Sequence, residues 1–218
     1  MTNNQLQIKQ FVFGPFGTNT YVVYDEDKNA LIIDPACSNQ YEQQVLYRFI
    51  QLEALQVQAI IATHGHLDHL WGAPWACEQW HMPVLMNEAD IPLAQDMQGQ
   101  YDLFGIHATA QPFPMESLSG EAGLSVKRSD SATVCQRSGL SILSTPGHTP
   151  GSVCLYWEKE KVLLSGDTLF QMGYGRTDLP GGNMHELIMS LESLFALPAA
   201  VHVYPGHGAS TTIGAERR

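Results

Sequence analysis

The sequence has no hydrophobic run long enough to cross a membrane, and none of its cysteines form a paired motif of the zinc-binding kind. The first five residues carry no basic segment followed by an apolar one, so no signal peptide is predicted. The four cysteines, at positions 37, 77, 135 and 154, are widely spaced. We therefore expect buried free thiols in a reducing compartment, which predicts a cytoplasmic protein.

Positive charge is also scarce. The chain has 11 Lys and Arg against 22 Asp and Glu, for a formal net charge of −11, and its dense basic sites are limited to Lys127-Arg128 and Arg217-Arg218. Binding to a phosphate backbone depends on clustered Lys and Arg, so this balance argues against a nucleic-acid partner. We expect a small-molecule partner and no membrane association, and the sequence leaves the oligomeric state open.

No low-complexity linker divides the 218 residues, so we predict one domain of two strand-rich halves, residues 1–105 and 106–218. Apolar and β-branched runs predict the strands. They fall at residues 6–13, 20–24, 30–33, 59–62, 83–86, 124–126, 140–143, 153–157, 162–164 and 201–204. Helices are predicted after Asp34-Pro35, at 73–80 and at 184–195.

The helix after Asp34-Pro35 is expected to begin at Ser38 as its N-cap. Its predicted buried face is Val45, Leu46, Phe49, Leu52 and Leu55, and that of the helix at 184–195 is Leu187, Ile188, Leu191 and Leu194. Glycine and proline interrupt residues 95–122. We expect a long loop there, which is either a lid beside the functional site or an irregular surface connection.

Metal-binding chemistry concentrates in residues 63–69, Thr-His-Gly-His-Leu-Asp-His, directly after an apolar strand. Residues two apart in an extended segment point to the same side, so His64 and His66 can share one cation. Asp68 and His69 follow the turn and are expected to face a different point. The arrangement predicts two neighbouring metals rather than one.

Three further predicted strand ends carry His148, Asp167 and His207, each close to a glycine that lets backbone and metal approach closely. A lone histidine is more often a structural or surface group, but here several independent strand ends carry ligand chemistry together. The seven side chains suit two first-row cations. The predicted ligands are His64, His66 and His148 for the first metal and Asp68, His69 and His207 for the second, with Asp167 bridging.

The motifs T-H-G-H-L-D-H, P-G-H-T-P-G, S-G-D-T and Y-P-G-H-G resemble those of the metallo-β-lactamase superfamily. They are particularly similar to the single-domain branch related to glyoxalase II, the hydroxyacylglutathione hydrolases. Residues 173–178 and 210–217 also resemble that branch, and the likeness spans nearly the whole chain. The resemblance implies an α/β fold, a four-layer αββα sandwich with the metals at one edge of its two sheets.

The ligand set and the resemblance together predict a binuclear metal-dependent hydrolase. Two divalent cations about 3.5–4 Å apart can hold a bridging water and lower its pKa towards about 7, and the resulting hydroxide can attack an acyl carbonyl. Asp68 is the predicted catalytic residue, which orients the nucleophile and handles its proton. Zinc is expected, while iron and manganese suit the same ligands. The expected substrate is a hydroxyacyl-glutathione or a related acyl thioester.

Two departures from glyoxalase II bear on the substrate. Arg176 stands where that family has a lysine for a glutathione carboxylate, and can serve as a carboxylate fork. Asp178 replaces a tyrosine, so Arg176 and Asp178 can equally form a structural ion pair. The family's helical C-terminal domain has no counterpart in these 218 residues. These two departures, Asp178 in place of the tyrosine and the missing helical domain, weaken the expectation of glutathione itself.

The sequence is also compatible with a different reaction class. The persulfide dioxygenases share the implied fold and a similar G-R-T-D loop, and use one iron held by two histidines and an aspartate. The matching residues are His64, His148 and Asp167. That alternative leaves His66, Asp68, His69 and His207 without a direct metal role. A lactone hydrolase or another ester hydrolase of the same fold is the third interpretation.

Overall fold

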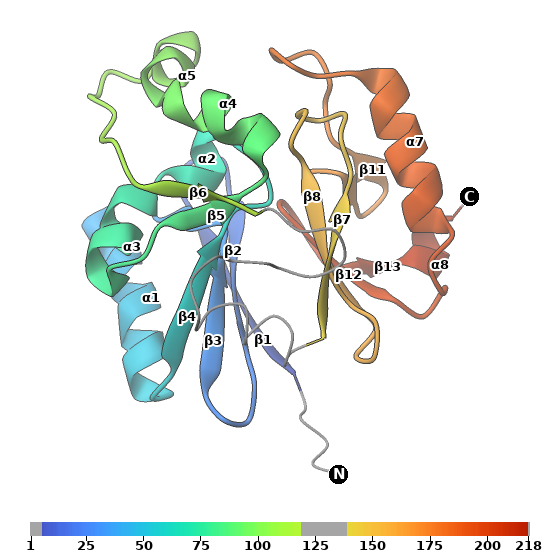
Figure 1. The fold of residues 1–218 in the computed structure, drawn as a ribbon, viewed down its shortest axis with the longest axis horizontal. Coiled ribbons are helices and arrows are strands. Elements are labelled where there is room, and N and C mark those ends of the chain that lie inside the picture. Colours follow the sequence, from blue (N-terminus) through green and yellow to red (C-terminus); the bar gives the residue numbers. More distant parts are fainter. Residues whose placement is uncertain (1–5, 119–138, 218) are drawn as a thin grey trace. The chain divides into compact units, whose positions relative to one another are not determined.

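The computed structural model describes residues 6–118 and 139–217 (Figure 1). The chain folds into two compact units. The first consists of residues 1–86 and 91–117, and the second of residues 87–90 and 118–218. The predicted strand at 124–126, the basic pair at 127–128, Cys135 and part of the expected lid lie outside the described residues. That one domain spans the whole chain stays a prediction.

The first unit contains a six-stranded mixed sheet with the strands in sequence order. Its strands are β1 (Gln7–Phe13), β2 (Thr18–Tyr24), β3 (Asn29–Ile33), β4 (Gln56–Ile61), β5 (Val84–Met86) and β6 (Met115–Ser117). The first three strands pair antiparallel, and β3 to β6 run parallel. The carboxyl ends of β3, β4 and β5 therefore meet at one edge of this sheet.

Helix α1 (Gln40–Leu52) packs on the first sheet through Leu46 and Ile50, four residues apart on one helical face. Its N-cap is Asn39, whose side chain accepts the Glu42 N–H, so the prediction of Ser38 is wrong by one residue. Ser38 instead donates to the Glu42 carboxylate. Leu52, predicted as buried, is 85% exposed because it lies at the helix end, off the face of Leu46 and Ile50.

The remaining helices of the first unit are α2 (Leu67–Leu70), α3 (Ala73–Trp80), α4 (Ile91–Gln95) and α5 (Met97–Leu103). The expectation of a long loop from residue 95 is wrong at residues 97–103 and 115–117, which form α5 and β6. Gly99 does not end the helix, since Met97, Gln100 and Tyr101 bury one face of α5. Packing outweighs the helix-breaking tendency of a single glycine.

The second unit contains a five-stranded sheet in the order β13-β12-β9-β8-β7 and a separate two-stranded hairpin. The sheet strands are β7 (Leu140–Ser144), β8 (Val153–Trp157), β9 (Val162–Gly166), β12 (His202–Pro205) and β13 (Thr211–Thr212), and the hairpin is β10 (Leu169–Phe170) with β11 (Gly173–Tyr174). Strands β9 and β12 run parallel, so their carboxyl ends lie at the same edge.

Helix α7 (Met184–Phe195) lies along one face of the second sheet, near the short α8 (Ile213–Glu216) (Figure 1). Leu187, Leu191 and Leu194 of α7 pack into a core with residues of β8, β9 and β12. Ile188, predicted on the same face, is 46% exposed because the turn of the helix carries it away from the three leucines. Asn183 caps the helix through the N–H groups of residues 185 and 186.

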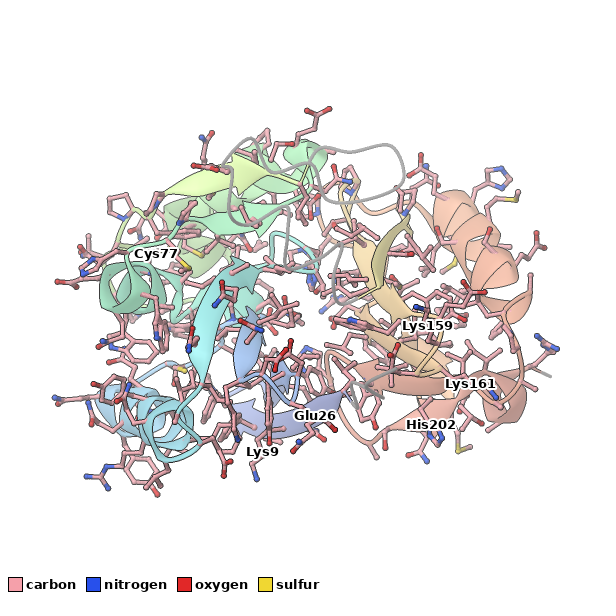
Figure 2. All side chains as sticks on the ribbon, turned by 60° about the horizontal axis from the view of Figure 1, so that its bottom comes forward. Lys9, Glu26, Cys77, Lys159, Lys161 and His202 are labelled. Atoms are coloured by element: carbon pink, nitrogen blue, oxygen red, sulfur yellow. The ribbon has the colours of Figure 1, made fainter. Side chains whose placement is uncertain are left out.

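The cysteine and histidine side chains considered next lie outside the ligand motifs, and their burial matches their polarity. Figure 2 shows Cys77 directed inward from α3, and this residue is 5% exposed. The four histidines predicted to lie outside the functional site, at positions 81, 107, 185 and 202, are all exposed. No helix among the described residues is both long enough and apolar enough to cross a membrane.

Candidate metal centre

Four of the predicted ligands, His64, His66, Asp68 and His69, called the first ligand set, lie at the carboxyl end of β4 in the first unit. His64 follows the strand, His66 has extended backbone at the N-cap of α2, and the other two lie within α2. The ligand atoms of His64 and His66 are within 4.8 Å of one another, as are those of Asp68 and His69. The ring centroids of His64 and His69 are 4.1 Å apart. The turn thus folds all four groups into one cluster.

Asp34 supports this cluster from the end of the neighbouring strand β3. It is 1% exposed, and its carboxylate accepts the Thr63 N–H at 2.7 Å and the Thr63 hydroxyl at 2.8 Å. Its Oδ2 also lies 3.0 Å from Nδ1 of His69. A carboxylate can only accept, so His69 carries its proton on Nδ1 and presents Nε2 as a lone-pair donor.

Thr63 links Asp34 to His64 and orients the imidazole of His64. Its hydroxyl proton is directed at Asp34, so its oxygen accepts from Nδ1 of His64 at 3.1 Å, which leaves Nε2 of His64 as a lone-pair donor. Asp68 is held separately, because the Thr18 hydroxyl of β2 donates to its Oδ2 at 2.8 Å. Three members of the first set therefore have their ligand atoms oriented by side chains.

Gln100 of α5 fixes the backbone of the same loop. The Gln100 side chain is buried; its amide oxygen accepts the Leu67 N–H at 2.9 Å, and its amide nitrogen donates to the carbonyl of Gly65 at 3.1 Å. Sequence reasoning missed Gln100 because the contact spans more than 30 residues and falls where a loop was expected. It missed the supporting role of Asp34 as well, although a carboxylate directly after a buried strand was a usable signal.

The second ligand set, His148, Asp167 and His207, lies in the second unit on three separate loops. The residues follow β7, β9 and β12 respectively. Oδ2 of Asp167 is 3.6 Å from Nε2 of His148 and 3.5 Å from Nε2 of His207. One carboxylate oxygen of Asp167 thus lies close to both imidazoles.

A backbone group orients His148. Its Nδ1 donates to the carbonyl oxygen of Arg176 at 2.7 Å, which leaves Nε2 directed at Asp167. The chain passes so closely here that a Cβ on Gly175 would clash with the carbonyl oxygen of Asp167. Glycine is therefore required at position 175, where the loop passes close to both Asp167 and His148.

The side chain of Arg176 is paired with Asp178. Its Nε and a terminal nitrogen bind the two carboxylate oxygens at 2.6 and 2.7 Å, and both side chains are more than half exposed. The hydrogen bonds from Arg176 lower the pKa of Asp178 to about 2, so this carboxylate stays ionised at neutral pH. Of the two predicted roles, the described structure contains the ion pair.

A family model for the metallo-β-lactamase superfamily matches residues 13–207 of the sequence. The chain belongs to the metallo-β-lactamase superfamily. The hydroxyacylglutathione hydrolase GloC of Haemophilus influenzae is 33% identical over 205 residues, which cover 93% of this chain and 91% of that protein. The BLEG-1 B3 metallo-β-lactamase superposes with a TM-score of 0.83 at 35% identity, over 96% of each chain. TTHA1623, solved in a di-iron-bound form, gives 0.80 at 32% identity, over 96% of this chain and 97% of that one.

These matches confirm the predicted metallo-β-lactamase fold, with mixed helices and strands and two sheets. Membership and the histidine–aspartate ligands make the chain a metallo-hydrolase of this superfamily. The donor chemistry fits divalent first-row cations, since imidazole nitrogens oriented by carboxylate, hydroxyl and carbonyl partners are typical of metal ligands. The identity of the metals is a separate question, because histidine and carboxylate suit zinc, iron and manganese.

Proposed function

We propose that the two ligand sets together form one binuclear metal centre. The first cation is assigned to His64, His66 and His148, and the second to Asp68, His69 and His207, with Asp167 bridging. The observation that carries this proposal is the fixed orientation of the imidazoles: Nδ1 of His69 and of His148 each has a partner that leaves Nε2 for a metal. A surface histidine that binds no metal does not need a partner that fixes its tautomer.

We propose further that the reaction is hydrolysis of an acyl thioester of the glyoxalase II type. When bound, two divalent cations supply an activated water and a Lewis acid for the carbonyl oxygen. Asp68 accepts the proton of the attacking water and returns it to the leaving group. Thr18 keeps the Asp68 carboxylate in place through the bond to Oδ2. Zinc is the proposed metal, and the di-iron form of TTHA1623 makes iron the first alternative.

The proposed substrate is a hydroxyacyl-glutathione or a similar small acyl thioester, as the name of GloC supports. Arg176 is the proposed contact for a substrate carboxylate, and it reaches that role by exchanging partners with Asp178. The proposed location is the cytoplasm, supported by the buried free thiols of Cys37, Cys77 and Cys154. Their pKa values are raised by burial, as expected for inert structural thiols.

The mononuclear persulfide dioxygenase interpretation uses His64, His148 and Asp167 only. It leaves unexplained why His69 and Asp68 have orienting partners in Asp34 and Thr18, as His64 and His148 have in Thr63 and the Arg176 carbonyl. The hydrolase proposal accounts for both ligand sets and is therefore preferred.

The deciding experiment uses the whole protein, stripped with a chelator and reloaded with zinc, manganese or iron. Metal content is measured together with hydrolysis of S-lactoylglutathione. We expect about two metals per chain and turnover that chelation abolishes. Absence of turnover in every metal form would remove this substrate class, and oxygen uptake with glutathione persulfide by the iron form would then establish the rival reaction.

A further inference from the structure

Residues 87–90 belong to a different unit from the residues that precede and follow them in the chain. Residues up to Met86 at the end of β5 and from Ile91 at the start of α4 belong to the first unit, whereas residues 87–90 belong to the second. The segment contains a single 3₁₀ turn, Glu88–Asp90. A short excursion of this kind needs a specific contact to hold it, because so few residues bury little apolar surface.

Asp90 makes that contact, and it makes it with the loop that carries His148. Asp90 is 0% exposed. Its Oδ2 accepts the hydroxyl of Thr149 at 2.6 Å, and its Oδ1 accepts the N–H of Gly151 at 2.6 Å. A carboxylate hydrogen-bonded by two donors at this distance, away from water, is a strong and directional anchor.

The residues around Asp90 are shaped for this anchor. A Cβ on Gly151 would lie 2.6 Å from the Asp90 carboxylate, so only glycine allows the N–H to approach. Thr149 gives its proton to Asp90, and its oxygen therefore accepts from the Ser152 hydroxyl at 2.7 Å. One carboxylate thus fixes both a side chain and a backbone group directly after His148.

The other side of the loop is held by α7. The N–H of Asn183 donates to the carbonyl of Gly147 at 2.8 Å, and the hydroxyl of Ser190 donates to the carbonyl of Pro146 at 2.7 Å. His148 is therefore placed between two fastened segments. The bond from its ring to the Arg176 carbonyl then sets the rotation of the imidazole.

We propose that Asp90 is a positioning residue for His148, which acts through Thr149 and Gly151 to hold the imidazole where it binds metal. This inference rests on the proposed metal role of His148. Asp90 itself contacts neither metal nor substrate in this proposal. The Asp90 carboxylate is a charged acceptor that the Thr149 hydroxyl and the Gly151 N–H share.

The test compares Asp90→Asn with Thr149→Val, with the double variant and with the control Asp25→Asn. Asp25 also accepts backbone and side-chain donors, but in the turn between β2 and β3. An amide in place of the Asp90 carboxylate can accept only one of the two donors. We expect Asp90→Asn and Thr149→Val to weaken binding of one metal equivalent by about 10- to 100-fold in chelator competition. The double variant should lose no more than Asp90→Asn alone, because both remove one chain of contacts.

A second measurement works without metal and so separates this proposal from the proposed function. In the metal-free protein, the Nδ1–H proton of His148 is followed by NMR and assigned through its loss in His148→Gln. We expect that signal to shift or broaden in Asp90→Asn and in Thr149→Val and to stay unchanged in Asp25→Asn.

Two results would overturn the inference. One is an unchanged His148 signal in both folded variants. The other is a loss of metal affinity in Asp90→Asn no larger than in Asp25→Asn. If Asp90→Asn does not fold, Thr149→Val alone decides, since it keeps the bond from Gly151 to Asp90 and removes only the hydroxyl. A wild-type protein that binds no metal but shows the Asp90-dependent signal would refute the proposed function and not the positioning role.

Discussion

The two ligand sets differ in the groups that orient their side chains. The first set comes from six consecutive positions after one strand, and remote side chains orient it: Asp34, Thr18 and Gln100. The second set comes from three loops up to 59 residues apart in sequence, and a backbone carbonyl orients His148. In the first set, His69 and Asp68 are thus held by distant side chains, whereas the rotation of the His148 imidazole is set by a backbone carbonyl.

This contrast predicts where the molecule is vulnerable to substitution. A side-chain partner is lost when its residue is replaced, but a carbonyl remains whatever side chain follows it. Support of the first set should therefore be weakened by a single substitution at Asp34 and, to a smaller extent, at Thr18. The orientation of His148 should survive replacement of Arg176, since only the carbonyl of that residue is used.

The largest effect is expected at Asp68. Asp68→Asn keeps the size of the group but removes its ability to take a proton, so kcat for thioester hydrolysis should fall by about 10²- to 10⁴-fold. Steady-state kinetics measure kcat, and metal analysis measures how many cations stay bound. Thr18→Val is the matched control, because it removes only the hydrogen bond to Asp68 and should cost far less. Full activity with both metals retained in Asp68→Asn would rule out the catalytic role.

Asp34→Asn should have the next largest effect. Asn tolerates the left-handed backbone of this residue, φ 52°, so the substitution isolates the carboxylate. With the amide nitrogen at the Oδ2 position, the Thr63 hydroxyl and Nδ1 of His69 both lose their acceptor. Each buried donor left unpaired costs about 1–3 kcal/mol of stability. Metal affinity should fall about 10- to 100-fold because Nδ1 of His69 loses its partner. Urea unfolding of the metal-free protein and chelator competition measure the two effects. Unchanged metal affinity would show that His69 does not depend on Asp34.

A smaller effect is expected at the exposed pair. Arg176→Ala should leave metal binding unchanged and raise KM for a glutathione thioester, whereas Asp178→Ala should lower KM by freeing the guanidinium. Exposed ion pairs contribute little, so about two- to fivefold is expected in each direction. Loss of metal from Arg176→Ala would contradict the backbone role assigned to residue 176. Equal KM values in both variants would make the pair purely structural.

The smallest effect at neutral pH concerns Cys37, which lies in the first unit. Burial raises the pKa of this thiol from 9.0 to about 12. A folded-state pKa above the unfolded value means that the stabilising contribution is complete below pH 9 and is lost as the pH rises towards 12. Urea unfolding should therefore show a loss of about 1 kcal/mol between about pH 8 and pH 10. The same loss in Cys37→Ala would assign it to another group.

Much of the fold and of the candidate centre can be predicted because the signals are local. Strand β8 and helices α3 and α7 have the predicted bounds, since alternation, helical spacing and capping depend on near neighbours. The ligand motifs are equally local: a strand end, a glycine and a polar side chain. Their grouping within each unit follows from strands that end at the same sheet edge.

The supporting residues could not be predicted for the opposite reason. Asp34, Gln100 and Asp90 reach their partners across 29 to 61 positions. Apart from the place of Asp34 at a strand end, no local pattern distinguishes them from ordinary polar residues. The errors at Ser38 and Gly99 have different causes. Two adjacent residues compete for one cap, and tertiary burial keeps α5 helical through a glycine.

The excursion of residues 87–90 makes the two units inseparable as pieces of chain. A cut after Ser117 leaves Asp90 on the fragment that carries the first ligand set, although the loop it anchors belongs to the other fragment. The second fragment then lacks the carboxylate that holds Thr149 and Gly151, and it can complete that loop only by taking Asp90 back from its complement. Gene fusion, circular permutation or division of this protein therefore has to keep the two units together, because the stretch of chain that builds one carries a part that the other needs.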